Sequence, residues 1–569
     1  MSSPRFPEPP PAVPATPLEK VDSLLEGLAS RKDTWVALGI PERIRLLKEA
    51  VTASLSVADA WVEAACKAKG IPRDSQRAGE EWLGGPMTMI RNMRLLIETL
   101  EAGGAPKPPK VSKSISGQTV AQVFPANIFD KLMFTGISAE VWMEPGKDAA
   151  QARIYRDKAA GISHPGKVSL VLGAGNVASI GPMDALYKLY AEDEVVILKT
   201  NPVNAYLGPW LEASMKPFID AGYFAVVHGG AEVGAHLTGH RLVDTIHMTG
   251  SDKTYDAIVW GSTPDEQARR KAANEPLNTK PISAELGCVT PVLIVPGPWS
   301  DADIEFQARH VAAMVTNNAS FNCNAAKVLV TAKGWPLREK FLKAVHEILA
   351  GIPARKAYYP GAQQRYQGFI SHYPDAQKLA PGADDIVPWT IIPDVKPDPS
   401  EYALTNEAFC GVLAEVELDA TDAGTFLDKA TDFANDGCWG TLSTMMLIHP
   451  TSQKEYATQF ENCLANLRFG GIGVNVWAGL VYGLVVTTWG AFPGHPPTDI
   501  RSGVGVVHNT YLFDHPQKSI IRAPFRIFPT PAWFSDHKTQ ALLGRRMTAF
   551  EAAPSFLKLP AVIAAAARG

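Results

Sequence analysis

Apolar residues follow two patterns along the chain. From Leu18 to about Ala102 they recur at spacings of three and four, which predicts a series of helices ending at Gly103-Gly104. From Val168 onward short apolar runs alternate with helical segments, as in a parallel sheet that is covered on both faces. We predict strands at Val168–Leu172, Val195–Leu198, around Val226, and at Leu242–Met248, Pro291–Val295 and Val328–Val330.

The stretch from 168 to 199 has the pattern of one βαβ unit, since a helix with an apolar face lies between its two predicted strands. Such units usually bind a nucleotide at the ends of the strands. The turn from Gly173 to Ala178 superficially matches the glycine fingerprint of dinucleotide-binding folds. However, Asp193 and Glu194 precede the second strand, where a ribose-binding acid would follow it. Turn chemistry therefore explains these glycines better than an ordinary dinucleotide loop does.

The composition indicates a folded protein of several domains. With 569 residues, 46% of them hydrophobic, the chain is long enough for two or three sizeable cores. Its 54 basic and 58 acidic residues give a formal charge of −4, and no block of basic residues suits a polyanion. We therefore expect no nucleic acid partner.

Cysteine usage and segment composition predict the compartment. Six cysteines stand at wide intervals without a CxxC pair, so we interpret them as reduced thiols. Residues 1–17 are rich in proline and lack the apolar run of a signal peptide, and we interpret them as a disordered tail. The longest apolar stretches, such as 557–567, are too short or too interrupted to span a bilayer. A soluble, cytoplasmic protein is therefore expected.

Five short segments stand in a particular order along the chain. They are Gly-Asn-Val-Ala at 175–178, Ile-Leu-Lys-Thr-Asn-Pro at 197–202, Met-Thr-Gly-Ser at 248–251, Ala-Glu-Leu-Gly at 284–287 and Asn-Cys-Asn-Ala at 322–325. In order and spacing they resemble the aldehyde dehydrogenase superfamily. The segment from Asn406 to Gly411 resembles a later motif of that family, and the resemblance covers roughly residues 125 to 520.

The resemblance implies a reaction and three catalytic residues. A thiolate that adds to an aldehyde gives a thiohemiacetal, which can transfer hydride to a nicotinamide and leave a thioester. By resemblance Cys323 is this nucleophile, and the Asn176 side chain and the Cys323 backbone N–H stabilise the oxyanion. Glu285 is then the general base that activates water and releases the acid. Taken alone, a single cysteine is more often an apolar filler of the core.

The resemblance also assigns the cofactor site, for NAD or NADP. Lys199 at a strand end is expected to bond the adenosine ribose, and Glu407 the nicotinamide ribose. Pro202 stands where members that prefer NAD often carry a glutamate, so no charge there repels the 2′-phosphate of NADP. The cofactor-binding residues we expect are Lys199, Gly230, Gly234, Gly250, Ser251, Glu407 and Phe409.

Other interpretations stay open. The branch of the family that passes the acyl group to coenzyme A generally lacks an acid where Glu285 stands, and a non-catalytic member would serve as a scaffold or binding protein. The aromatic and apolar run 476–484 either lines a substrate tunnel or packs in the core. We expect no metal site, because His236 and His240 lack the glutamate of a metalloprotease helix.

The predicted fold is α/β, with a Rossmann-like cofactor domain, an α/β catalytic domain and a small oligomerisation element. Since no arginine near the motifs indicates a carboxylate anchor, we expect an apolar or aromatic aldehyde as substrate. The family resemblance implies a homodimer or homotetramer. We assign residues 18–150 and 167–284 to the cofactor domain, 285–500 to the catalytic domain, 151–166 and 501–530 to the oligomerisation element, and 531–569 to a C-terminal extension.

Overall fold

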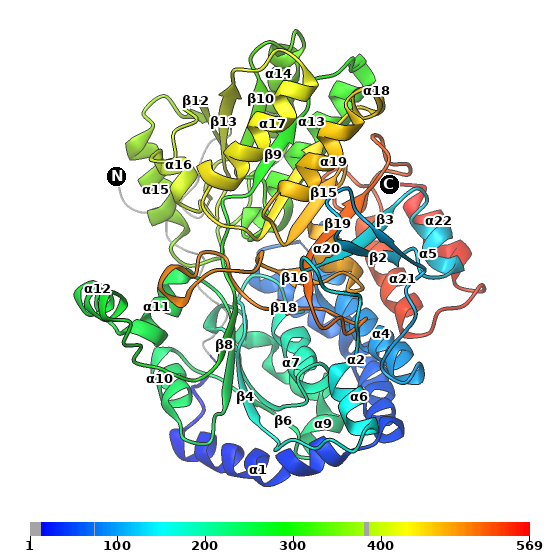
Figure 1. Ribbon diagram of the computed structural model, residues 1–569, viewed down its shortest axis with the longest axis vertical. Coiled ribbons are helices and arrows are strands. Elements are labelled where there is room, and N and C mark those ends of the chain that lie inside the picture. The colour runs from blue at the N-terminus through cyan, green and yellow to red at the C-terminus, as the bar shows by residue number, and fades with distance from the viewer. Residues whose placement is uncertain (1–12, 73, 380–385) are drawn as a thin grey trace.

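The computed structural model describes residues 13–72, 74–379 and 386–569, so most of the predicted tail at 1–17 lies outside the described residues. Two α/β bodies lie one above the other in Figure 1, each built around its own sheet. The predicted α/β class with a Rossmann-like part is confirmed. Of the helices in the described ranges, none combines the length and apolar character needed to cross a bilayer.

The lower body contains the smaller sheet. Within the described residues six strands form it, in the order β17-β8-β7-β4-β5-β6, and all but β17 run parallel. Its central strands are almost entirely Val, Ile and Leu, because helices cover both faces of such a sheet. The strands are β4 (Val168–Leu172), β5 (Val195–Lys199), β6 (Phe224–Val227), β7 (Thr245–Thr249), β8 (Ile282–Glu285) and β17 (Gly503–Val504).

The predicted βαβ unit is present, with α7 (Ile180–Tyr190) joining β4 to β5. The strand predicted at Leu242–Met248 begins later than expected, at Thr245, because the backbone from His240 to Val243 makes a turn. The lower body also contains α1 (Leu18–Ala37), α6 (Arg153–Ala159), α8 (Gly208–Ser214), α9 (Lys216–Asp220), α10 (Ala231–Gly239), α11 (Asp252–Trp260) and α12 (Pro264–Ala273).

The upper body contains the larger sheet, with the order β1-β2-β3-β19-β15-β14-β9-β10-β13-β12-β11 among the described residues. Its middle strands are parallel, and helices pack against them (Figure 1). The middle strands are β9 (Pro291–Ile294), β10 (Val328–Ala332), β12 (Thr390–Val395), β13 (Val412–Leu418), β14 (Ser443–Leu447) and β15 (Gly471–Val474). The helices are α13 (Asp301–Thr316), α14 (Arg338–Gly351), α15 (Ala362–His372), α16 (Tyr402–Thr405), α17 (Ala423–Asp432), α18 (Pro450–Glu455), α19 (Ala457–Asn466) and α20 (Gly479–Leu484).

The edge of this sheet differs from the predicted domain division. Strands β1 (Lys110–Lys113), β2 (Thr119–Phe124) and β3 (Ser138–Met143), assigned by sequence to the cofactor domain, join β19 (Pro516–Arg522) of the larger sheet. The segment 151–166, assigned to the oligomerisation element, contains the helix α6 instead. Pairing between β3 and β19 joins segments far apart in the chain, which local patterns do not reveal. A role of residues 151–166 and 501–530 in oligomerisation stays a prediction.

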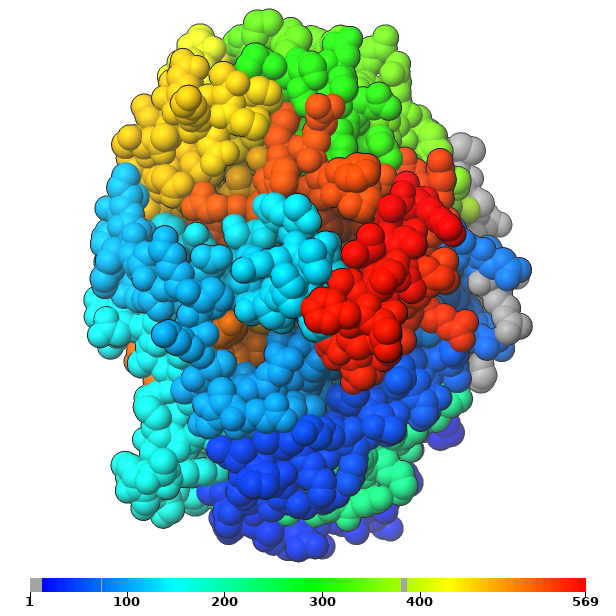
Figure 2. Space-filling model, turned by 90° about the vertical axis from the view of Figure 1, so that its right-hand side faces the viewer, coloured from blue at the N-terminus to red at the C-terminus, as the bar shows by residue number. Residues whose placement is uncertain are grey.

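The N-terminal helices and the C-terminal extension pack together. The helices predicted between 18 and 102 include α2 (Ile40–Ala68), α3 (Ala78–Trp82), a π-helical turn η1 (Leu83–Met87) and α4 (Thr88–Glu101). The extension forms α21 (Gln540–Ala552) and α22 (Leu559–Ala566), and α21 contacts α3, η1 and α4. Figure 2 shows the extension in red, lying against the blue N-terminal helices and the cyan segment that includes α5 (Ile128–Met133).

Candidate active site

Glu285 is the last residue of β8 and is fixed from both sides. It pairs in register with Thr249 of β7 and with Gly503 of β17, and its carbonyl accepts the Gly250 N–H at 3.0 Å. A side chain at Gly503 would lie 1.9 Å from the carbonyl oxygen of Ala284, and the φ of Gly503 is 115°, so glycine is needed there. The Glu285 side chain is 2% exposed. The carboxyl is therefore rigidly placed and shielded from water.

Cys323 lies in a loop between α13 and β10. The short turn before it, η3 (Asn317–Ser320), has positive φ at Asn318, Ala319 and Ser320 (52°, 55° and 69°). A left-handed backbone conformation costs about 1–2 kcal/mol at each residue other than glycine, so contacts with the surrounding structure must stabilise this turn. Lys327 fastens the other side of the loop, because its ammonium donates to the carbonyls of Asn322 and Cys323 at 3.1 and 3.0 Å.

The thiol of Cys323 and the carboxyl of Glu285 are in contact, with Sγ 3.2 Å from Oε1. Burial raises the pKa of Glu285 to about 8, and the nearby charge of Asp184 adds to this. Burial also raises the pKa of the Cys323 thiol, and the carboxyls of Glu285 and Glu407 raise it further. At neutral pH both groups are therefore mostly protonated in the resting site.

Asn176 lies in the turn between β4 and α7. Its side-chain amide donates to the Phe321 carbonyl at 2.9 Å, which ties it to the cysteine loop. Its own carbonyl accepts from Lys69, Asn318 and Tyr358 at 2.9, 3.1 and 3.1 Å. Within the described part of the chain, the backbone N–H of Cys323 donates to no protein group. The two expected oxyanion donors are thus held beside one loop.

Two cavities meet at these residues. One has a volume of about 380 Å³ and the other of about 1510 Å³. Four residues line both of them: Asn176, Ile180, Glu285 and Cys323. The three residues that the sequence assigned to catalysis therefore come together at the point where the cavities join. The run 476–484 faces the smaller cavity in part, through Trp477, Leu480, Tyr482 and Leu484, while Val476 and Val481 are buried.

All seven residues that the sequence assigned to the cofactor line the larger cavity. Lys199 ends β5, and its ammonium makes one long contact, 3.4 Å from the Thr200 carbonyl. Glu407 lies 3.3 Å from the Lys327 ammonium and accepts the Cys288 N–H at 3.3 Å. Burial raises the pKa of Glu407, and Lys327 opposes this. A side chain at Gly287 would lie 2.0 Å from a Glu407 oxygen, so Gly287 makes room for this carboxylate.

Several residues that support the site were missed from the sequence. Lys69 directly follows α2, and its buried ammonium also binds Glu81 and Asn318 at 2.8 and 3.0 Å. No local signal marks this residue, because its partners lie far along the chain. Lys327 carried a signal, since a lysine directly before a predicted buried strand must find a partner.

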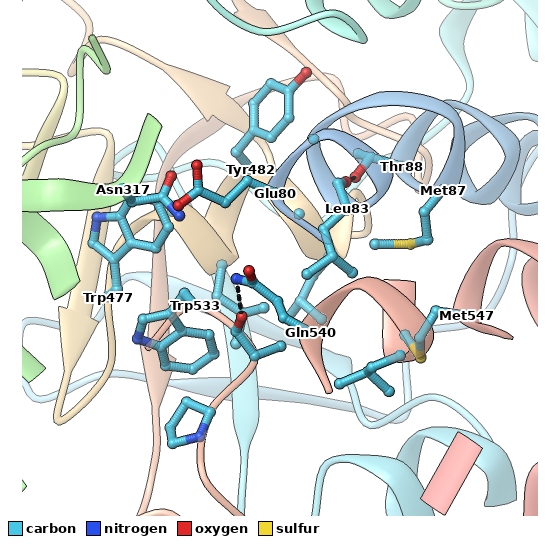
Figure 3. Close-up of a pocket in the computed structure, with 18 of the residues that line it drawn as sticks. Glu80, Leu83, Met87, Thr88, Asn317, Trp477, Tyr482, Trp533, Gln540 and Met547 are labelled. Carbon is cyan, nitrogen blue, oxygen red and sulfur yellow. Dashed lines mark hydrogen bonds between the residues drawn. The ribbon is translucent and has the colours of Figure 1, made fainter. Parts of the chain in front are cut away.

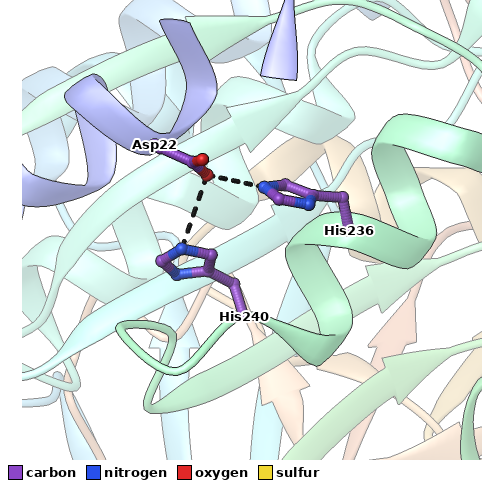
Figure 4. A group of neighbouring side chains, drawn as sticks. All are labelled: Asp22, His236 and His240. Atoms are coloured by element: carbon purple, nitrogen blue, oxygen red, sulfur yellow. Dashed lines mark hydrogen bonds and ion pairs between the residues drawn. The ribbon is translucent and has the colours of Figure 1, made fainter. Parts of the chain in front are cut away.

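Asp22, His236 and His240 form a group of possible metal ligands (Figure 4). One Asp22 oxygen lies 2.6 Å from His236 Nε2 and 3.4 Å from His240 Nε2. The Leu242 N–H donates to His240 Nδ1 at 3.2 Å, which places the proton of neutral His240 on Nε2, where a metal would bind. We therefore interpret the group as a carboxylate that joins α1 to α10. The expected absence of a metal stays a prediction.

The fold and the site together define a class of protein. It has a Rossmann-like domain that carries a buried glutamate, a second α/β domain that carries a half-buried cysteine in contact with it, and a cavity lined by residues of both. A family model described as "aldehyde dehydrogenase family" matches residues 195–384. The aldehyde dehydrogenase, dimeric NADP-preferring, of Mus musculus is 23% identical over 319 residues, which are 54% of this chain and 64% of that protein.

A D-glyceraldehyde dehydrogenase (NADP(+)) of Picrophilus torridus is 28% identical over 158 residues, covering 27% of this chain and 28% of that protein. The matches thus span less than two thirds of the length of these relatives. Among solved structures, glyceraldehyde-3-phosphate dehydrogenase of Methanocaldococcus jannaschii, complexed with NADP, has a TM-score of 0.59 at 13% identity, covering 92% of this chain and 100% of that one. An NAD-dependent aldehyde dehydrogenase of Sinorhizobium meliloti has a TM-score of 0.58 at 16% identity, covering 92% and 90%. Residues 195–384 are therefore similar to the aldehyde dehydrogenase family, and the fold is that of these solved dehydrogenases.

Proposed function

We propose that the protein oxidises an aldehyde to its carboxylic acid with NAD or NADP, through a cysteine thiohemiacetal and a thioester. The observation that carries this proposal is the contact of Cys323 with Glu285, 3.2 Å apart, where the two cavities join. One cavity then takes the aldehyde and the other the cofactor. A thiol that can be reached from both sides is what transfer between two bound molecules requires.

The larger cavity fits a dinucleotide. The Lys199 ammonium faces this cavity and makes one long hydrogen bond, although it can donate three. Among the described residues no carboxylate pairs with it, so it is available to bind ribose hydroxyls. Gly230 precedes α10, and a side chain added there would meet nothing within 4 Å, so a phosphate can approach the helix start closely. Glu407 would hold the second ribose. When bound, the nicotinamide supplies the hydride acceptor.

The residues of the chain divide the remaining work. Glu285 in its ionised form takes the proton of the Cys323 thiol, and the thiolate sulfur bonds to the aldehyde carbon. The Asn176 amide and the Cys323 N–H donate to the oxyanion, and the thioester forms when hydride leaves. Glu285 must then lose its proton before it can accept one from the attacking water. Water adds to the thioester, the carbon–sulfur bond breaks, and the acid is released.

The residues that line the two cavities indicate which substrate and which cofactor the protein accepts. Pro202 lines the larger cavity, so no acid there opposes a 2′-phosphate, and the mouse relative is described as NADP-preferring. We therefore propose that NADP is accepted along with NAD. Apolar side chains dominate the wall of the smaller cavity, which favours an apolar or aromatic aldehyde. Homo-oligomerisation and a cytoplasmic location stay predictions.

Steady-state rates with an aldehyde panel and both cofactors test the proposal. Cofactor reduction is expected in the wild-type protein and should be lost in Cys323→Ala. Cys463→Ala is the matched control, because that buried cysteine lies in α19 outside both cavities. Free acid formed without coenzyme A would exclude acyl transfer to coenzyme A. A panel in which no aldehyde reduces either cofactor would instead favour a scaffold or binding protein.

A further inference from the structure

Part of the wall of the smaller cavity, which Cys323 also lines, is built by the C-terminal extension. Trp533, Leu543, Met547 and Val562 line it, together with residues of the N-terminal helices. In Figure 3, Met87 of η1 and Met547 of α21 extend into the same cavity, which Trp477 and Trp533 also line. The cavity therefore continues from the reactive thiol to a compartment between η1 and the extension.

Among the described residues, the charged side chains that line this cavity are paired with opposite charges, with one exception. Apart from Glu285, every charged side chain that lines the cavity faces an opposite charge. Arg91 faces two, since its second terminal nitrogen lies 3.8 Å from Asp130. The three ion pairs are Lys69–Glu81 at 2.8 Å, Arg355–Glu80 at 2.7 Å and Arg91–Glu551 at 2.7 Å. An anionic substrate tail would compete with the carboxylates of these buried pairs, whereas an alkyl chain meets a wall that is mostly apolar.

The extension is firmly attached to the N-terminal helices. Side chains at Gly79 or Gly544 would lie 2.5 Å from Gln540 and from Trp82 respectively, so these glycines allow α3 and α21 to approach closely. Glu551 of α21 is fully buried and accepts hydrogen bonds from Arg91 at 2.7 Å and from Arg94 at 2.6 Å. The compartment is thus a built part of the fold, with one wall supplied by residues 531–569.

We propose that the extension completes a binding site for the unreacting alkyl chain of an aliphatic aldehyde, with Met547 marking the end of the chain furthest from Cys323. This rests on the proposed function, because Cys323 defines where the aldehyde group lies. The flexible side chains of Met87 and Met547 suit a chain that adopts several conformations. Each methylene that becomes buried should raise kcat/KM roughly fourfold, until the chain reaches Met547.

The test changes the length of the compartment. Met547→Trp should lower kcat/KM for decanal at least tenfold more than kcat/KM for propanal. Met547→Ala should shift the preference toward longer chains. The matched control is Leu542→Trp, which adds the same side chain on the exposed side of α21, away from the cavity. It should keep the wild-type chain-length profile.

Calorimetric binding of decan-1-ol, which is not an aldehyde, separates this proposal from the proposed function. The proposed site is supported if the wild-type protein binds decan-1-ol, Met547→Trp weakens this binding and Leu542→Trp keeps it. This holds even if the protein oxidises no aldehyde. A flat dependence of kcat/KM on chain length, equal losses for propanal and decanal in Met547→Trp, or decan-1-ol binding that Met547→Trp leaves intact would overturn the proposal. Oxidation of aldehydes would survive each of these results.

Discussion

Replacing Glu285 by glutamine tests whether this carboxyl is held protonated by its surroundings. Burial raises its pKa from 4.5 to about 8, so the folded protein keeps a proton that the unfolded chain releases. A group whose pKa rises on folding contributes stability below the unfolded pKa and loses it as the pH rises. Since each pH unit corresponds to about 1.36 kcal/mol, the loss is under about 1 kcal/mol at pH 5 and about 5 kcal/mol at pH 9.

Glutamine is neutral at every pH and avoids this loss. For a chain of this length the entropy of unfolding is about 1.2 kcal/mol/K, so Glu285→Gln should raise the melting temperature by about 4 °C at pH 9 and by less than about 1 °C at pH 5. Glu63→Gln on the exposed side of α2 is the matched control. The difference between its melting temperature and that of the wild-type protein should not change with pH. Melting curves recorded at both pH values and at one scan rate measure this difference.

The same variant should lose the hydrolytic step. Reduced cofactor should form more slowly, because Glu285 no longer takes the thiol proton, and should stop at one equivalent per site, because the thioester accumulates without a base. In the wild-type protein the ionised fraction of Glu285 rises about tenfold between pH 7 and pH 9, and thioester hydrolysis should rise with it. If the melting temperatures of variant and wild type differed equally at pH 5 and pH 9, or if the variant were less stable at pH 9, the conclusion that Glu285 is held protonated would be refuted.

Three further predictions concern the donors, the cofactor and the extension. Asn176→Ala should lower kcat about 10²- to 10³-fold, measured under saturating aldehyde, whereas an unchanged kcat would exclude it as an oxyanion donor. Pro202→Glu should raise the KM for NADP at least about tenfold and leave that for NAD nearly unchanged, because a carboxylate repels the 2′-phosphate; equal changes for both would contradict this. Glu551→Gln should destabilise the protein by about 3–5 kcal/mol in thermal or denaturant unfolding, since it leaves Arg94 without a buried counter-charge and Arg91 with Asp130 alone, 3.8 Å away. Glu98→Gln, which removes an exposed partner of Arg94, should cost less than about 1 kcal/mol, and equal losses would argue against the buried pair.

Much of the site was predictable because parallel strands end at one edge of a sheet. Lys199 and Glu285 end β5 and β8, and the loop after β4 carries Asn176, so motifs spread along the chain reach one cavity. The short βαβ connections made these positions visible in the local pattern. The strands themselves were also predictable, because buried parallel strands are continuous apolar runs.

What the sequence did not reveal depends on contacts between distant segments. Lys69 binds Asn318, which lies 249 residues further on, and no pattern near either residue predicts the pair. For the same reason the extension was assigned no place, although its α21 packs on α3 and closes the smaller cavity. The motifs near Cys323 therefore predict the chemistry, whereas the choice of aldehyde depends on a wall contributed by residues 531–569. Proteins that share this fold can keep the first and change the second, because the two are encoded in separate parts of the chain.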